Sequence, residues 1–222
     1  CGFQRRFDAS YIAAKEAISN GSIGVPSMIR IMFADHPVPP IEFLKTGGDP
    51  FMDLSPHDMD FARWCLDDEP VEVYATGSSS TFELKECGVY DNATMLVKFK
   101  KGSVVTLNMS RGATYGYDQR SEIFGDKGLV QVGNELNNST LVSDKNGFHS
   151  SCLKYSFPQR FKEAFEHEIN TFANVILNNE VWPIKMNDCV VAQQIAEAAQ
   201  ISAAEGRVVH IAAPVTAPVG HR

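Results

Sequence analysis

The chain has 222 residues, of which 44% are hydrophobic, and carries 20 Lys and Arg against 27 Asp and Glu. That length and apolar share are sufficient for a real core, in one large domain or two small ones. The charges are mixed along the chain without a basic cluster, which argues against a nucleic-acid partner. No apolar run approaches the roughly 20 residues that cross a bilayer, so we expect no membrane insertion.

The five cysteines are odd in number and widely scattered, and no Cys-x-x-Cys pair occurs. Such spacing is typical of free thiols and gives no support to a zinc or redox site. The N-terminus has two arginines but no hydrophobic stretch after them, so nothing there resembles an export signal. These features predict a cytoplasmic protein.

The first third of the chain predicts a helix, a strand and a second helix. Residues 8–20 form the first helix, with Asp8 as its cap, and 27–34 alternate as a strand does. A proline-rich loop follows at 36–40. The second helix is predicted over 55–66, with Ser55 as N-cap and a proline at the first helical position.

The middle of the chain reads as short strands separated by turns, and the last third returns to helix. Two apolar stripes mark the late helices, one beginning at Phe161 and continuing through Phe172, the other beginning at Ala192. Consecutive short strands predict an open, mostly antiparallel sheet, and the element order predicts an α+β domain with helices packed on one face. We expect this domain to cover residues 1–211 and the proline-rich residues 212–222 to be a disordered tail. The predicted strands are 71–76, 93–99, 103–109, 120–124, 129–132 and 140–142.

The densest group of polar residues lies where a loop opens the second helix. His57 falls in the first helical turn, whose dipole disfavours imidazolium, whereas Asp53 just upstream could favour it. Opposed influences of this kind could hold a general base near neutrality. The alternative is equally open: His57 shares a helical stripe with Phe61 and could be a hydrogen-bonded core residue.

Other interpretations of the same block are weaker. Asp58 and Asp60 are best explained as acidic residues in the first turns of a helix, where they are common. One histidine with several aspartates could also suggest a metal, but the usual two-His or Cys-rich ligand sets are missing, and His36 lies in a loop that neither supports nor excludes it. We therefore predict no metal site.

Taken together, several motifs resemble one protein family along nearly the whole chain, from Gly2 to about Ile211. The resemblance is to the C-terminal part of inositol 2-dehydrogenase and its relatives, the family that also includes glucose-fructose oxidoreductase and rhizopine-catabolism proteins. The motifs that carry it are Gly-Phe-Gln-Arg-Arg-Phe-Asp at 2–8, Ile-Gly-Val-Pro at 23–26, Asp-Leu-Ser-Pro-His-Asp-Met-Asp at 53–60, Tyr-Gly-Tyr-Asp at 115–118 and Glu-Ile-Phe-Gly at 122–125.

This resemblance implies that cofactor binding and substrate binding belong to two different domains. Members of the family bind NAD or NADP in an N-terminal Rossmann domain, and their C-terminal sheet faces the active site and commonly forms the oligomer interface. The chain looks like the second part, the substrate-binding half of a polyol or sugar dehydrogenase, and a homo-oligomer through its sheet is expected. Because residue 1 is Cys rather than Met, we expect a cut through a longer protein.

The resemblance also implies roles for six residues. His57 would take part in removing the hydroxyl proton, and Asp53, four residues earlier, would help to hold the substrate and the catalytic groups.

Arg5 would lie near the junction of cofactor and substrate, Asp35 would bind a polyol hydroxyl, and Tyr117 would contact substrate. Phe157 stands where some inositol dehydrogenases carry tryptophan and would pack on the ring. Each also has an ordinary interpretation, as a solvated loop charge for Arg5 and Asp35, and as sheet packing or core for Tyr117 and Phe157.

Two departures from the family affect the expected activity. No Gly-x-Gly-x-x-Gly follows a strand, and the family's Glu-Lys-Pro segment with its catalytic lysine is absent. Lys45 has no motif match that would make it a substitute. We therefore expect the chain to be inactive alone and to bind no cofactor tightly. The alternative is a non-enzymatic polyol-binding or oligomerising module, and metal-dependent hydrolysis ranks far below both.

Overall fold

A computed structural model describes residues 1–211, so the predicted tail at 212–222 lies outside the described part. Its centre is a seven-stranded sheet with the order β6-β5-β1-β4-β3-β2-β9. Neighbouring strands are antiparallel except for the parallel pair β1 and β4, which confirms the predicted open, mostly antiparallel sheet. The strands are β1 (Pro26–Ala34), β2 (Pro70–Ser78), β3 (Asn92–Phe99), β4 (Val104–Ser110), β5 (Asp118–Gly125), β6 (Gly128–Val132) and β9 (Val209–His210).

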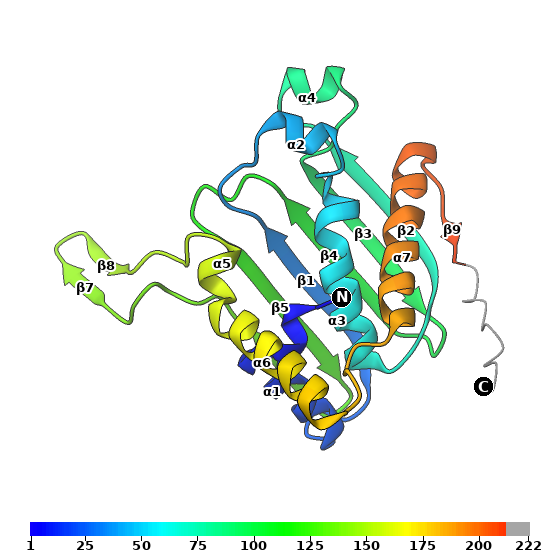
Figure 1. The fold of residues 1–222 in the computed structure, drawn as a ribbon. Helices are drawn as coiled ribbons and strands as arrows, with labels where there is room; N and C mark the ends of the chain where they lie inside the picture. Colours follow the sequence, from blue (N-terminus) through cyan, green and yellow to red (C-terminus); the bar gives the residue numbers. More distant parts are fainter. Residues whose placement is uncertain (212–222) are drawn as a thin grey trace.

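The longer helices lie on one side of this sheet, as the sequence predicts, and α3 and α7 cross its face (Figure 1). Asp8 caps the first α-helix as expected, because its carboxylate accepts hydrogen bonds from the backbone N–H groups of Ser10 and Tyr11. The helices are η1 (Gln4–Phe7), α1 (Ala9–Ser19), α2 (Ile41–Lys45), η2 (Pro50–Leu54), α3 (Ser55–Leu66), α4 (Phe82–Glu86), α5 (Phe157–Arg160), α6 (Lys162–Asn178) and α7 (Met186–Glu205).

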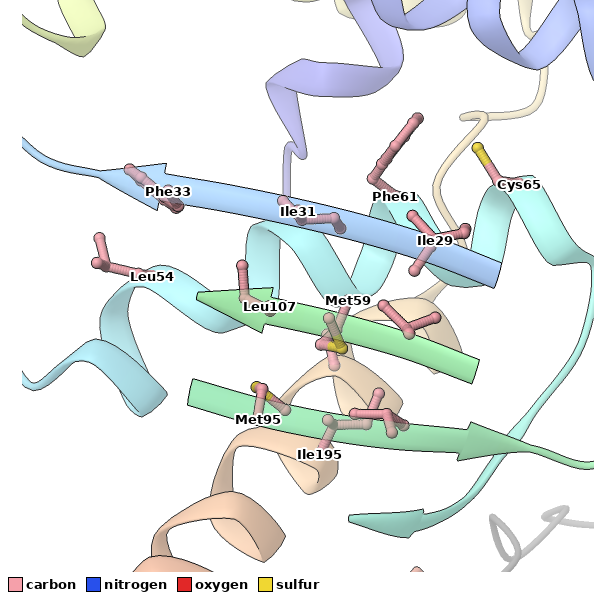
Figure 2. Packing of buried hydrophobic residues seen from close by; sticks show 14 of the residues in the cluster. Ile29, Ile31, Phe33, Leu54, Met59, Phe61, Cys65, Met95, Leu107 and Ile195 are labelled. Carbon is pink, nitrogen blue, oxygen red and sulfur yellow. The ribbon is translucent and has the colours of Figure 1, made fainter. Parts of the chain in front are cut away.

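The core lies between the sheet and these two helices. Alternate residues of β1, β4 and β3 face the helices, and Met59 of α3 and Ile195 of α7 fill the space between them (Figure 2). Each such side chain contributes roughly 1.5–3 kcal/mol when fully buried. The packing therefore fixes α3 rigidly above the middle of the sheet.

The start of α3 differs from the expected cap. Ser55 is the first residue of the helix, but its hydroxyl donates to the carbonyl of Phe51 instead of capping the backbone N–H groups. The chain already turns through the wide π-helical turn η2, and Asp49 accepts from the first N–H groups of that turn. The cap lies six residues earlier than predicted because this extra turn continues into the helix.

Helix α6 also departs from expectation. Its apolar stripe exists, but only its beginning is buried, around Phe161 and Ala164. Ile169 is 66% exposed and Phe172 is 51% exposed, so the stripe faces outward beyond the sheet. By contrast, the second stripe is confirmed, because Ala192 and its neighbours along α7 are buried.

Two further regions complete the fold. The strand predicted at 140–142 is part of a separate hairpin, β7 (Leu141–Asp144) with β8 (Gly147–Ser150), that projects from the body (Figure 1). Within residues 1–211, no helix covers the opposite face of the sheet, where alternate residues of β1 and β3 are exposed. In residues 1–211 no helix is both long and apolar enough to cross a membrane.

Candidate functional site

The ends of three neighbouring strands lie together at one end of the sheet and supply the polar groups of a pocket. Because β1 and β4 are parallel and adjacent, both end there, and Asp35 and Arg111 follow directly after them. β5 runs the other way, so Tyr117 immediately before it reaches the same edge. The predicted residues Asp35 and Tyr117 are thus brought together by strand order.

Arg111 joins the two acidic groups of this edge. Its Nη1 donates to Oδ2 of Asp35 at 2.8 Å and its Nη2 donates to Oδ2 of Asp53. Nε and Nη2 also donate to the carbonyl of Gly48, at 3.1 and 2.6 Å. The guanidinium is buried, whereas Asp53 keeps 39% of its side chain exposed. The arginine therefore fixes both carboxylates while leaving Asp53 open to the pocket.

His57 reaches the same pocket from the first turn of α3. Its ring is half-buried, it meets Phe3 edge to face at 6.0 Å, and its Nδ1 is buried without a hydrogen-bond partner among the described residues. Burial, and then the positive charge of Arg5, lower the pKa of His57 from 6.5 to about 3. The imidazole is therefore neutral at pH 7.

The expected balance between the charge of Asp53 and the helix dipole does not set the pKa of His57. The carboxylate of Asp53 is held by Arg111, and the pKa of His57 reflects burial and Arg5. The pocket does bring Asp53 and His57 together, however, because both line it.

Aromatic side chains complete the pocket, whose volume is about 250 Å³. Tyr117 packs edge to face against Phe33 at 5.6 Å, and burial raises the pKa of its phenol, which stays protonated. Phe157 opens α5 and is half exposed, so one side of its ring is free. The lining residues are Gly2, Gln4, Phe33, Asp35, Asp53, Leu54, His57, Arg111, Tyr117, Phe157, Phe165 and Glu168.

Arg5 is the one predicted site residue that does not line this pocket. It is buried beneath it, where Nη2 donates to Oε1 of Gln119 at 2.8 Å and Nε lies 3.1 Å from Oδ1 of Asp58. Gln119 Nε2 donates to the same Asp58 oxygen at 2.9 Å, which closes a triangle. Asp58 lies in the first turn of α3, as expected, and it is also a buried ion-pair partner.

The sequence predictions missed Arg111 and Glu168. Arg111 directly follows a predicted strand, and nothing else in the sequence around it distinguishes it from an ordinary residue at the end of a strand. Glu168 lies within the amphipathic helix α6, where one carboxylate has no distinguishing pattern.

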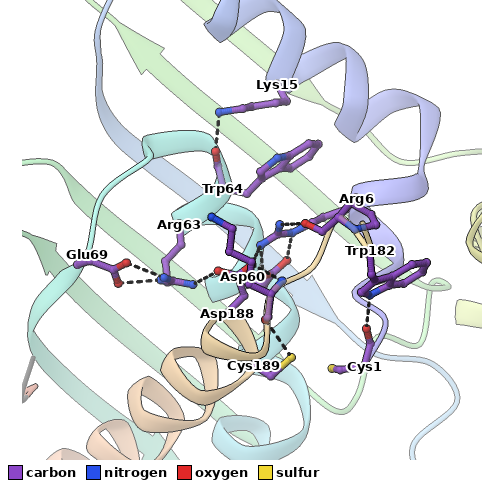
Figure 3. Close-up of polar contacts among 12 residues, drawn as sticks. Cys1, Arg6, Lys15, Asp60, Arg63, Trp64, Glu69, Trp182, Asp188 and Cys189 are labelled. Atoms are coloured by element: carbon purple, nitrogen blue, oxygen red, sulfur yellow. Dashed lines mark hydrogen bonds and ion pairs between the residues drawn. The ribbon is translucent and has the colours of Figure 1, made fainter. Parts of the chain in front are cut away.

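A second polar cluster lies along the C-terminal half of α3, and we call Arg6, Asp60, Arg63, Glu69 and Asp188 the Arg6 cluster (Figure 3). Arg6 binds Asp60 through two nitrogens, at 2.6 and 2.8 Å, and lies 3.1 Å from Asp188. Arg63 bridges Asp188 at 3.1 Å and Glu69 at 2.7 Å.

A groove of about 830 Å³ adjoins the Arg6 cluster. It is larger than the strand-end pocket, but the two arginines in its wall are already paired with carboxylates. Size alone therefore does not make it the better candidate. Among residues 1–211, no group of three or more His, Cys, Asp and Glu side chains is arranged to hold a metal ion.

Comparison with known proteins identifies the family of this chain. Residues 11–131 match the model of the GFO/IDH/MocA C-terminal domain. The chain belongs to this family. It is 35% identical to myo-inositol 2-dehydrogenase of Thermotoga maritima over 95% of its own length, and 36% identical to inositol 2-dehydrogenase of Rhizobium meliloti, also over 95%. The chain spans 63% and 64% of the lengths of those two relatives.

Solved structures of family members have the same fold. A putative myo-inositol dehydrogenase from Sinorhizobium meliloti superimposes with a TM-score of 0.91 at 36% identity, covering 95% of this chain and 64% of that one. Scyllo-inositol dehydrogenase from Lactobacillus casei, solved with bound NAD(H) and scyllo-inositol, gives a TM-score of 0.89 at 30% identity, with 96% and 64% covered. This GFO/IDH/MocA domain therefore corresponds to roughly two thirds of full dehydrogenase chains.

Proposed function

We propose that this domain is the substrate-binding part of an NAD- or NADP-dependent dehydrogenase that acts on myo-inositol or a similar polyol or sugar. The observation that carries the proposal is the pocket in which Asp35, Asp53 and His57 meet. Two carboxylates whose geometry is fixed by one arginine suit vicinal hydroxyl groups, because each carboxylate accepts strong hydrogen bonds. Relatives named as inositol dehydrogenases support the substrate class.

Each pocket residue then has a defined task. Asp35 and Asp53 accept hydrogen bonds from ring hydroxyls, Tyr117 offers a protonated phenol, and Phe157 covers the apolar face of the ring. His57 lines the pocket and is neutral at pH 7, so its imidazole is free to take the hydroxyl proton as the alcohol becomes a ketone, although a pKa of about 3 makes it a weak acceptor in this domain alone.

The residues present do not fit the nicotinamide cofactor itself. A pyrophosphate needs a glycine-rich turn between a strand and a helix N-terminus, and residues 1–211 contain no Gly-x-Gly-x-x-Gly there. When bound, a nicotinamide accepts hydride from the carbinol carbon. In the proposed enzyme its binding site belongs to the part of the relatives that this chain does not span.

The exposed stripe of α6 supports a docking place for that part. Ile169, Phe172 and Ile176 form an outward apolar row that a monomeric domain would ordinarily bury. The row lies near residue 1, because Trp182 packs edge to face on Phe172 and its indole N–H donates to the carbonyl of Cys1 at 3.2 Å. We expect the cofactor domain to cover this row.

Self-association through the open sheet face is a further part of the proposal. At one end of that face Met28 pairs with Phe124, and Phe124 pairs with Leu129, so three apolar side chains stand side by side. Tyr74 and Leu96 form a second exposed apolar pair on β2 and β3, in a neighbouring row that also contains Thr106 and Arg30. An uncovered sheet face of this kind favours pairing with a second copy.

Calorimetric titration with NAD tests the division between the two parts. The chain alone should show no micromolar affinity, because the donors that hold pyrophosphate are not in it. Micromolar binding to this chain would contradict the proposal.

Sedimentation should show an oligomer, and a strict monomer at high concentration would contradict the assembly through the sheet.

Fusion of a relative's Rossmann domain before Gly2 tests the activity. The fusion should oxidise myo-inositol with NAD, and Asp35→Asn should raise the KM because it removes one charged acceptor. Asp144→Asn on the exposed hairpin is the matched control and should leave the KM unchanged. A folded fusion that binds NAD and polyol without oxidising the polyol would favour the non-enzymatic binding module instead.

A further inference from the structure

Glu168 is a residue of the strand-end pocket without a task in the proposed function. It lies on α6, whereas Asp35 follows β1 and Asp53 belongs to η2, so it enters the pocket from a different element. Phe165, three residues earlier on α6, lines the pocket beside it, as neighbours at this helical spacing do. One side of α6 therefore faces the pocket and adds a third carboxylate to it.

The carboxylate of Glu168 lies directly against the backbone of Gly2. A β-carbon added to Gly2 would overlap Oε1 of Glu168, so glycine leaves the carboxylate its place and a larger residue does not. Gly2 is not among the glycines with a positive φ angle, so its backbone conformation by itself does not require glycine. The close approach of Glu168 therefore explains the glycine that begins the motif at 2–8.

Glu168 also differs from the other two carboxylates of the pocket in its partners. Arg111 donates to both Asp35 and Asp53 and fixes them. Within residues 1–211, Glu168 forms no ion pair with an arginine, lysine or histidine; burial raises its pKa, and the amino group of Cys1 acts in the opposite direction. A half-buried carboxyl group that lies in a pocket without such a partner has hydrogen-bonding capacity left for a ligand.

The charges of the pocket predict which ligands it rejects. Its lining has three carboxylates against one guanidinium, and the amino group of Cys1 offsets one of the remaining two negative charges. The buried Arg5 below the pocket is paired with Asp58 and adds little net charge. A carboxylate or phosphate on a ligand would therefore meet uncompensated negative charge, whereas hydroxyl groups can donate hydrogen bonds to each carboxylate.

We propose that Glu168 is a specificity-determining residue, which accepts a hydrogen bond from a ring hydroxyl and excludes anionic polyols such as uronates, and that Gly2 is the positioning residue that gives its carboxylate room. This inference rests on the proposed function and narrows the substrate class to polyols without a negative charge. Neither residue takes part in the proton transfer. The expected effect is therefore on affinity and on discrimination between ligands.

The test compares two probes, myo-inositol and D-glucuronate, in NMR titrations of the chain that follow the chemical shifts of the pocket residues at millimolar ligand. The wild type should bind myo-inositol at least about tenfold more tightly than glucuronate. Glu168→Gln keeps the size of the side chain and removes its charge, so it should lower this affinity ratio by on the order of tenfold. Glu163→Gln is the matched control, because it makes the same change at an exposed position of α6 and should leave the ratio unchanged.

Gly2→Ala tests the positioning role. Its methyl group displaces the flexible carboxylate of Glu168, so it should lower the affinity ratio in the wild type but not in the Glu168→Gln background, where no charge remains to be displaced. An equal effect of Gly2→Ala in both backgrounds would contradict the role of Gly2. Inositol binding with an unchanged ratio in folded Glu168→Gln would overturn the role of Glu168 alone. A folded wild type that binds no myo-inositol would contradict the proposed function, and the inference would fail with it.

Discussion

The strand-end pocket and the Arg6 cluster are both built around buried arginines and aspartates beside the same helix, yet they differ in how their charges are satisfied. In the Arg6 cluster, arginines and carboxylates alternate from Asp60 to Glu69, and each contacts an opposite charge. In the pocket, Asp53 is partly exposed, and Nδ1 of His57 is buried without a hydrogen-bond partner in the described part of the chain. The first arrangement is complete by itself, and the second has capacity left for a ligand.

This difference shows why charge content alone does not locate a site. In a fully paired network all donors and acceptors are satisfied within the protein, so the network mainly stabilises the structure. A polar group that is held in place but not satisfied is what a substrate hydroxyl can bind. The comparison leads to expectations about activity at one cluster and about stability at the other.

The largest expected effect is on turnover in the fused enzyme. His57→Ala should lower kcat by about 10²-fold or more, the usual contribution of a positioned general base. Its melting temperature should change little, since the ring is only half-buried. Unchanged polyol oxidation would refute the role of His57, and a large fall in melting temperature together with lost activity would favour a packing role.

The Arg6 cluster should respond in stability. Asp60→Ala should lower the free energy of unfolding by about 2 kcal/mol, because Arg6 loses the carboxylate that it binds through two nitrogens and retains Asp188 and the carbonyl of Pro183. Denaturant unfolding of the chain measures this change. In the fusion, Asp60→Ala tested well below its melting temperature should leave the KM for polyol near the wild-type value, and a strongly raised KM would break the distinction between the clusters.

The pH dependence of stability should reveal the low pKa of His57. The folded pKa of His57 is about 3 and its ordinary value is 6.5, so below pH 6.5 the unfolded chain takes up a proton that the folded chain refuses. Relative to His57→Gln, the wild type should therefore lose about 1 kcal/mol of unfolding free energy between pH 6 and 5.

Asp58 titrates in the opposite sense over the same range. Its folded pKa of about 6 exceeds the ordinary 3.8, so its protonation stabilises the folded state as the pH falls from 6 toward 3.8. The unfolding free energy of the wild type should therefore vary less with pH than the titration of His57 alone would cause. The difference between the wild type and His57→Gln gives the contribution of the histidine. A constant difference across this range would show that His57 is not kept neutral.

The smallest effect is expected at the outer edge of the Arg6 cluster. Glu69 is 44% exposed, so its pair with Arg63 is screened by solvent, and Arg63 also keeps Asp188. Glu69→Gln should cost about 0.5 kcal/mol or less, and high salt should reduce the difference further. A loss of unfolding free energy as large as that of Asp60→Ala would show that solvent exposure does not determine how much each ion pair of the Arg6 cluster contributes to stability.

Local features of the molecule were predictable from the sequence. Asp8 caps the first helix, the main strands lie within a few residues of their expected bounds, and the apolar stripe of α7 faces the core. These features depend on neighbours along the chain, through the periods of two and 3.6 residues that strands and helices impose. The outward position of the α6 stripe was not predictable, since periodicity identifies an apolar face without saying what covers it.

The sequence by itself therefore determined the α+β class, the capped helix and the spacing that places Asp53 and His57 near one helix start. Only the tertiary structure decided their partners. Arg111 reaches Asp35 across 76 positions and Arg5 reaches Gln119 across 114. Such pairs depend on the parallel meeting of β1 and β4 and on the packing of η1 under α3, which no local pattern encodes. The burial and the neighbouring Arg5 charge that lower the pKa of His57 are both products of that packing.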